Sequence, residues 1–169
     1  MLKQKKKSPL TPVARIPKPE PGLIFRYGYV WLREHKEGKE NASKDRPACI
    51  LLQLQSNTNR RNNEKTQTQV NDGDVIILPI TTQPPDSDMF SVELSVEDKE
   101  RCGLDPETPS WIIVSEYNTD QWPNADLRAV PGTGEFYYGV APPGLMKRIR
   151  EQFKKAREAK KTFGFKRPS

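Results

Sequence analysis

Lys44–Leu54, KDRPACILLQL, joins a charged corner directly to a short apolar run through a single proline. Its apolar run, Ala48–Leu52, has the length and composition of a buried strand. Pro47 fixes its own backbone angle and biases Arg46 toward an extended conformation, which suits the start of a strand. We therefore expect Arg46 to lie where the core meets solvent, on a rigid element that could hold its guanidinium against a phosphate. The alternative is that Arg46 forms an ordinary surface ion pair with a nearby acid, Asp45 or Glu40.

The composition describes one domain with basic ends. The chain has 169 residues, of which 34% are hydrophobic and 30% charged, and its formal charge is +6. This balance favours an anionic partner, nucleic acid before membrane, unless the basic ends are simply solvated. No apolar run approaches the roughly 20 residues that span a bilayer, and the lysines at the N-terminus are not followed by the apolar segment of a secretory signal.

Cysteine and histidine are scarce. Cys49 and Cys102 give neither a disulfide framework nor the spacing of metal ligands, and His35 is the single histidine. A reduced, cytoplasmic protein without a metal or other cofactor is the simplest interpretation.

Three regions follow from the distribution of proline and lysine. Residues 1–22 combine a run of lysines near the start with five prolines after residue 8. This composition predicts an extended, disordered basic arm. Residues 23–161 carry the apolar segments and are expected to form a single domain. Residues 162–169 are expected to form a basic tail. Within the domain, residues 55–73 are polar and asparagine-rich, which predicts a long hairpin loop.

The domain is predicted to be mainly β. Strands are expected at 24–33, 48–52, 75–80, 90–94, 111–114 and 136–140, with a bulge or sheet edge at Pro79. Ser95–Gly103 predicts a short internal helix, and Pro143–Lys161 a C-terminal helix with an apolar stripe. Short strands with polar excursions and a closing helix indicate a small, curled antiparallel sheet, in broad terms an SH3-like barrel. The chain has no βαβ alternation, glycine-rich phosphate loop or Ser-His-Asp pattern.

Several motifs, taken together in their order, resemble the MazF/PemK toxins of bacterial toxin-antitoxin systems, whose barrel fold is also that of Kid and CcdB. The match extends over roughly residues 23–150 and is carried by YGYVW at 27–31, KDRPACIL at 44–51, VIILPITT at 75–82, SWIIV at 110–114, EYN at 116–118 and WPNADLR at 122–128.

This resemblance implies a metal-independent endoribonuclease that cuts single-stranded RNA. Arg46 matches the arginine and Thr81 the hydroxyl residue that flank the scissile phosphate in the family, and Thr82 is the alternative hydroxyl. The chemistry needs no cofactor, because the 2′-hydroxyl of RNA is the nucleophile and the protein has mainly to position the phosphate and stabilise its developing charge. Arg46 would donate hydrogen bonds to the phosphate and would not act as a base, since its side chain stays protonated.

A general base and an acid for the leaving group remain to be assigned among four candidates: Glu116, His35, Asp126 and Arg128. Glu116 follows an apolar strand and could instead form a salt bridge at its rim. Asp126 and Arg128 would point to the same face of an extended segment, where an ion pair that supports the loop is the alternative.

Contacts to RNA are expected from basic and aromatic side chains, because single strands bind by base stacking and by backbone charge. Tyr29 and Trp31 could stack on bases, although such aromatics are more often part of a core. The predicted RNA-binding set is Tyr29, Trp31, Lys44, Arg60, Arg61 and Thr82.

Family members are typically homodimers blocked by an antitoxin, and the basic surface would suit an acidic, partly unfolded inhibitor. The second hypothesis is a non-catalytic barrel that keeps the fold and binds nucleic acid or a protein partner. A gyrase-directed toxin on the same fold has no supporting motif in this sequence.

Overall fold

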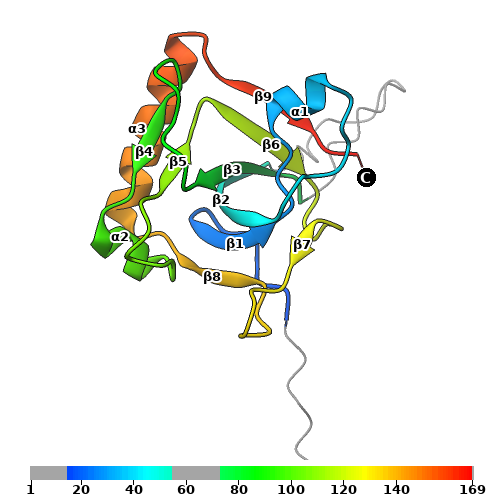
Figure 1. The fold of residues 1–169 in the computed structure, drawn as a ribbon, viewed down its shortest axis with the longest axis vertical. Helices are drawn as coiled ribbons and strands as arrows, with labels where there is room; N and C mark the ends of the chain where they lie inside the picture. The colour runs from blue at the N-terminus through cyan, green and yellow to red at the C-terminus, as the bar shows by residue number, and fades with distance from the viewer. Residues whose placement is uncertain (1–14, 55–72, 169) are drawn as a thin grey trace, which may run out of the picture.

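A computed structural model describes residues 15–54 and 73–168. Within these ranges the protein is mostly β, with one mainly antiparallel sheet, two short helices and a longer C-terminal helix (Figure 1). Residues 55–72 of the predicted loop at 55–73, with Arg60 and Arg61, and the first 14 residues of the predicted arm lie outside the described residues. None of the helices described is both long and apolar enough to cross a membrane.

The elements follow one another along the chain as β1 (Leu23–Tyr27), α1 (Leu32–Lys36), β2 (Arg46–Gln53), β3 (Val75–Thr81), β4 (Ser91–Glu93), α2 (Val96–Arg101), β5 (Trp111–Ile113), β6 (Glu116–Asp120), β7 (Leu127–Arg128), β8 (Tyr137–Val140), α3 (Pro143–Glu158) and β9 (Phe163–Lys166).

The sheet is built around the β2–β3 pair. β2 pairs antiparallel with β1 on one side and β3 on the other, which makes the predicted apolar run at 48–52 an interior strand. β1 continues the sheet to β7 and β8, and β3 continues it to β5 and β6, with β4 beside β5. Among the described strands these pairings do not close into a ring.

Pro79 lies in an interior strand, where the sequence predicted an edge or a bulge. β3 pairs with β6 over its first half and with β5 over its second half. Residues 114–115 separate β5 from β6, and Pro79 falls between the two paired stretches. A missing N–H is tolerated there, because the neighbouring strand is itself interrupted. The register irregularity that does occur is in β2, between Ile50 and Leu52.

The two faces of the sheet carry separate apolar cores, as the period of two along a strand requires. One core joins Ile24, Cys49, Leu78 and Ile112 to Leu145, Met146 and Ile149 of α3. The predicted apolar stripe of the C-terminal helix is thereby confirmed, and Figure 1 shows α3 along that side of the sheet. The other core is mainly aromatic and contains Phe25, Tyr27, Tyr29 and Trp31 together with Ala48, Ile50 and Ile77.

The internal helix was also predicted correctly. α2 begins after Ser95, whose hydroxyl accepts a hydrogen bond from the Asp98 N–H at 3.0 Å, while the Asp98 carboxylate accepts one from the Ser95 N–H at 3.1 Å. Gly103 ends the helix at φ +73°, and a Cβ there would lie 2.1 Å from the Tyr138 carbonyl oxygen. Glycine is therefore required both by the backbone angle and by the close approach of β8.

The prediction of a single strand over residues 24–33 is wrong. β1 ends at Tyr27, and α1 starts at Leu32. The residues between them are buried, and Val30 bonds to a side chain instead of a strand: its N–H donates to Asn118 Oδ1 at 3.1 Å, and its carbonyl accepts from Asn118 Nδ2 at 2.8 Å. One asparagine thus replaces a neighbouring strand, which alternation of apolar residues cannot reveal.

Residues 162–168 do not form the basic tail that was predicted from the sequence. Phe163–Lys166 forms β9, which pairs parallel with β6. Gly164 lies against the Tyr117 ring so closely that a Cβ would approach it to 2.0 Å. The next residue, Arg167, is only 3% exposed. β9 itself is mostly exposed, so the pattern of buried apolar residues that marks an interior strand is absent from it.

The end of the predicted basic arm is also tied to the domain. Pro17 accepts a hydrogen bond from the Trp122 indole at 2.9 Å, and the Gly22 N–H donates to the Ile50 carbonyl at 2.8 Å. Pro17 and Gly22 therefore contact the folded domain, although residues 15–22 lie outside the helices and strands.

We predict that Arg167→Met lowers the free energy of unfolding by about 3–5 kcal/mol, because it removes a buried cation from acceptors that stay buried. Urea denaturation followed by tryptophan fluorescence measures the change. Arg157→Met, at an exposed position of α3, is the matched control and should change stability by less than about 0.5 kcal/mol. Equal stability of the two variants would contradict this role for Arg167.

Candidate functional site

The β2–β3 register brings the start of one strand beside the end of the other. Arg46 is the first residue of β2 and Thr81 the last of β3, and the paired residues Ala48 and Pro79 lie two positions inward on each strand. Because every second residue of a strand shares a face, Arg46 and Thr81 continue the aromatic-core face of the sheet. Two residues 35 positions apart in sequence therefore meet at one rim.

A cleft of about 360 Å³ opens at this rim, and both Arg46 and Thr81 line it. Its polar wall contains three cations and one carboxylate, and its apolar wall consists of an indole, two prolines and two aliphatic side chains. The lining residues are Trp31, Arg33, Lys44, Arg46, Thr81, Gln83, Pro84, Pro85, Asp86, Met89 and Ile113.

Arg46 is held by stacking. Its guanidinium carbon lies 4.8 Å from the centroid of the Trp31 ring, and the guanidinium of Arg33 approaches the same ring at 5.6 Å. Within the described part of the chain, Arg46 forms no ion pair, and its buried Nε has no hydrogen-bond partner. Burial lowers the pKa of Arg46, Arg33 acts in the same direction, and Glu34 opposes them. The side chain is nevertheless a cation with donors available for an anion.

The alternative interpretation of Arg46, a surface ion pair with a neighbouring acid, is not what the structure contains. Asp45 instead lies 3.8 Å from Arg26 and 3.7 Å from Arg128. The backbone carbonyl of Glu40 accepts a hydrogen bond from Arg167.

Thr81 is buried, and it lines the cleft. It is 7% exposed, and its Oγ1 accepts a hydrogen bond from the Gln83 N–H at 3.1 Å. This bond fixes the hydroxyl oxygen and leaves its proton free to be donated. Thr82 has the opposite parity and lines a different pocket, with Pro47, Ile80 and Tyr138. The structure therefore separates the two candidate hydroxyls and places only Thr81 with Arg46.

The position of Trp31 depends on buried polar side chains beneath it. The Trp31 N–H donates to the Glu34 carboxylate at 3.1 Å, and the Leu32 N–H donates to Glu116 at 3.0 Å. Asn118 holds Val30 through both backbone groups. The segment that carries the indole is thus fixed residue by residue, and the indole in turn supports Arg46.

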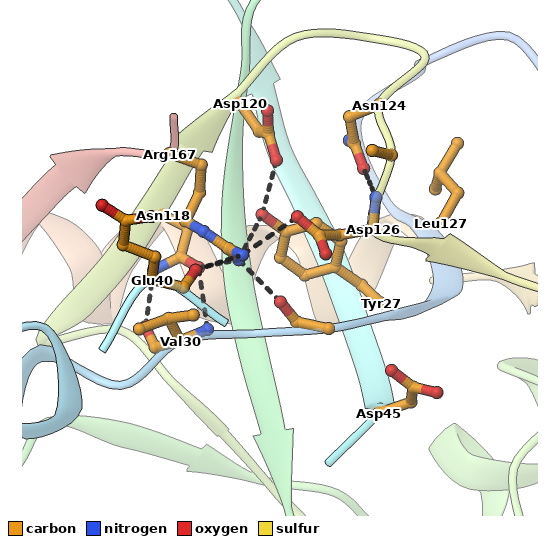
Figure 2. A network of polar contacts seen from close by, with 12 residues as sticks. Tyr27, Val30, Glu40, Asp45, Asn118, Asp120, Asn124, Asp126, Leu127 and Arg167 are labelled. Atoms are coloured by element: carbon orange, nitrogen blue, oxygen red, sulfur yellow. Dashed lines mark hydrogen bonds and ion pairs between the residues drawn. The ribbon is translucent and has the colours of Figure 1, made fainter. Parts of the chain in front are cut away.

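Arg167 completes this arrangement from the C-terminal end of the chain. Figure 2 shows its guanidinium between Tyr27, Asn118 and Asp126. It donates to the Asp126 carboxylate at 2.9 Å, to the Tyr27 hydroxyl at 3.1 Å and to the carbonyls of Gly28 and Glu40 at 2.6 and 3.2 Å. The two ends of the segment 28–40 are thereby bonded to one side chain.

Glu116 is a buried acid next to the cleft. Its Oε1 accepts hydrogen bonds from the Tyr29 hydroxyl at 3.1 Å and from the Leu32 N–H. Burial raises its pKa, and those hydrogen bonds oppose the shift. Glu116 lines a second pocket, of about 340 Å³, and Met89 lines both this pocket and the Arg46 cleft. The Glu116 carboxylate therefore does not line the Arg46 cleft, and it bonds to the segment that carries Trp31.

The other three candidates for acid-base chemistry lie elsewhere. His35 is in α1 and stacks on Phe165, with 3.9 Å between ring centroids and 6° between planes. Asp126 is bonded to Arg167 and lies 3.8 Å from Arg128. Arg128 also donates to the Ala125 carbonyl at 2.6 Å. The ion pair that supports the loop, which was the alternative for Asp126 and Arg128, is therefore present.

The predicted RNA-binding residues divide into three groups. Trp31 and Lys44 line the cleft. Tyr29 is 1% exposed and hydrogen-bonded to Glu116, so it has no free ring face for a base. Thr82 lines the separate pocket, and Arg60 and Arg61 belong to the residues that are not described.

Three polar residues of the cleft were not proposed from the sequence: Arg33, Gln83 and Asp86. Arg33 was assigned to a strand, where its direction could not be foreseen. Asp86 follows Pro84-Pro85, and two consecutive prolines restrict the loop that leaves β3. That pair was the available signal that an acid so close to Thr81 could be held near it.

Neither cysteine is placed for reaction. Cys49 and Cys102 are both buried and unpaired, and burial raises the pKa of Cys102 to about 11. Among residues 15–54 and 73–168, no group of three or more His, Cys, Asp and Glu side chains could hold a metal ion.

Comparison with known proteins gives no relative from which a role could be transferred. No protein-family model matches the chain, and no curated protein matches it significantly.

We predict that the stability of Glu116→Gln, relative to the unsubstituted protein, rises as the pH is raised from about 4 to 7. The folded protein binds a proton at Glu116 more readily than the unfolded chain, whose glutamate titrates near 4.5, so ionisation above that pH costs stability only in the unsubstituted protein. Glutamine keeps an oxygen for Tyr29 and Leu32. Urea denaturation at a series of pH values measures the difference, and a difference independent of pH would contradict a raised pKa.

Proposed function

We propose that this protein is a metal-independent endoribonuclease of the MazF/PemK type, which cuts single-stranded RNA by attack of the 2′-hydroxyl on the adjacent phosphorus. The observation that carries the proposal is the shared cleft of Arg46 and Thr81. A cationic fork and a hydroxyl donor, both on rigid strands, face one space that has room for a phosphodiester.

Arg46 is assigned to the non-bridging phosphate oxygens. Its guanidinium is charged at any working pH, stacks on Trp31, and has donors that are free within the described residues. A pair of parallel N–H donors stabilises the extra negative charge that develops as the fifth oxygen approaches phosphorus. Arg33 and Lys44, in the same cleft, add positive charge for the neighbouring phosphates.

Thr81 is assigned to orientation. Its oxygen accepts from the Gln83 N–H, so its proton is directed elsewhere and can be donated to the phosphate or to the attacking 2′-oxygen. A hydroxyl fixed in this way contributes by holding the reactants near their reacting geometry.

Asp86 is the candidate general base. Among the described residues that line the cleft it provides the single carboxylate, whereas Glu116, His35, Asp126 and Arg128 are not among the lining residues. In the proposed reaction the Asp86 carboxylate takes the proton of the 2′-hydroxyl as the new O–P bond forms. The bond from phosphorus to the 5′-oxygen breaks, Lys44 or solvent supplies the proton for that oxygen, and a 2′,3′-cyclic phosphate remains.

The proposal includes the architecture and partners that the family resemblance implies. The curled sheet with α3 on one face is compatible with an SH3-like barrel of the MazF type. A homodimer and an acidic antitoxin segment that covers the cationic cleft are the expected partners. The positive charge of Arg33, Lys44 and Arg46 on one wall suits an acidic inhibitor as well as RNA.

A non-catalytic protein that binds RNA in the same cleft is the second candidate. It is favoured by the position of the four acids and bases predicted from sequence, all of which have structural partners or lie in other pockets. The two candidates share a binding site and differ in whether the phosphodiester is broken.

We predict discrete cuts in a long single-stranded RNA incubated with the purified protein in EDTA, with products that end in 2′,3′-cyclic phosphate. Arg46→Ala should lower the cleavage rate by about 10²–10³-fold, since it removes a donor to the developing charge. Asp86→Asn should lower it by about 10²-fold or more, since amides do not accept the proton. Rates are measured from the loss of full-length RNA on denaturing gels.

The matched control is Arg101→Ala, which removes an exposed arginine of α2 that is paired with Glu97. Its cleavage rate should equal that of the unsubstituted protein. Binding without cuts, weakened by Arg46→Ala, would overturn the nuclease in favour of the binding protein. Cuts that survive Arg46→Ala at an unchanged rate would overturn the assignment of this cleft.

A further inference from the structure

The C-terminal helix and the residues that follow it carry a charge that the proposed reaction does not use. Residues 143–161 contain eight lysines and arginines and two glutamates, a formal charge of +6, which equals the formal charge of the whole chain. The remainder of the protein therefore sums to zero. All eight cations are exposed.

Four of these cations form one stripe along α3. Lys147, Arg150, Lys154 and Arg157 follow one another at intervals of three, four and three residues, which places them within an arc of about 80° over a length of about 15 Å. The apolar stripe of the same helix is buried, so the helix is fixed in rotation and the basic stripe is directed to solvent. Arg150 and Arg157 form no ion pair with any described residue, Lys154 lies 4.0 Å from Glu158, and Glu151 borders the stripe.

The stripe ends at a pocket that adjoins the cleft. α3 stops where Lys160 takes a φ of +54°, and the Lys161 N–H then donates to the Ala156 carbonyl at 2.8 Å. Lys161 lines the 340 Å³ pocket together with Met89, which also lines the Arg46 cleft. Lys161 thus extends the cationic side chains of α3 to a pocket that shares Met89 with the Arg46 cleft, and two acids, Asp88 and Glu116, line the same pocket.

We propose that this stripe binds the backbone phosphates of the same RNA strand whose scissile phosphate occupies the Arg46 cleft, several nucleotides away from the cut. The inference rests on the proposed function for the position of the strand. Successive cations stand about 5 Å apart along the helix, which suits a chain with one negative charge on each nucleotide. A membrane surface is a poorer fit, because an interfacial helix needs its apolar side chains free, and those of α3 are buried.

The test measures binding apart from cleavage. The probe is a fully 2′-O-methylated RNA of 24 nucleotides, which lacks the attacking hydroxyl, compared with a 6-nucleotide RNA of the same chemistry, by fluorescence anisotropy at several salt concentrations. The stripe variant is Arg150→Gln with Arg157→Gln. The matched control is Lys36→Gln with Lys155→Gln, which removes two exposed charges that lie off the stripe.

We expect the stripe variant to lose affinity for the 24-nucleotide RNA and to reduce the slope of log K against log salt by about 1.4, from two lost contacts at about 0.7 each. Its affinity for the 6-nucleotide RNA should match that of the control. Equal slopes for stripe variant and control would overturn the proposal, as would equal losses on both RNA lengths. Stripe-dependent binding of poly-glutamate, or of phosphatidylserine vesicles, without RNA binding would overturn it in favour of a polypeptide or a membrane.

The proposed function fails separately. If the unsubstituted protein binds the long RNA through the stripe but leaves unmethylated RNA intact, the stripe stands and the nuclease does not. If RNA is cut and the stripe variant binds like the control, the nuclease stands and the extended contact does not.

Discussion

The antiparallel register of β2 and β3 is the constraint on which the rest of the structure depends. It places the first residue of one strand, Arg46, beside the last residue of the other, Thr81. A shift of the register by one residue would turn Thr81 to the opposite face and bring Thr82 to the cleft in its place. The register is stabilised on both faces, because each strand contributes alternate side chains to two different cores.

Buried polar side chains hold the segment that forms the Trp31 side of the cleft. Arg167, Asn118 and Glu116 bond to the backbone and side chains of residues 27–32, and this segment carries the indole that stacks on Arg46. Each group is costly to bury alone, and the hydrogen bonds of this arrangement offset that cost. The C-terminal strand therefore contributes to the site through Arg167 without lining the cleft.

Much of the fold could be predicted from sequence, because apolar runs, proline and capping residues act locally. The strand after Pro47, the cap at Ser95 and the apolar stripe of α3 are of this kind. The end of β1 at Tyr27 and the formation of β9 could not be predicted, because they depend on the bonds of Asn118 and Arg167 to residues far away in sequence. Arg46 and Thr81 were proposed from motif order, and their common cleft is a property of the sheet register. Asp86 was missed, because an exposed aspartate in a loop has no motif of its own and its one sequence signal was the restriction that Pro84-Pro85 places on the loop.

A crystal structure of the protein with a short 2′-O-methylated RNA would show whether Arg46 and Thr81 bind the same phosphate. We expect one phosphate within hydrogen-bond distance of both the Arg46 guanidinium and the Thr81 hydroxyl, with the adjacent 2′-oxygen near Asp86. A strand bound elsewhere, or a phosphate that contacts Arg46 while Thr81 stays bonded only to its own loop, would contradict the central claim that these two residues act together.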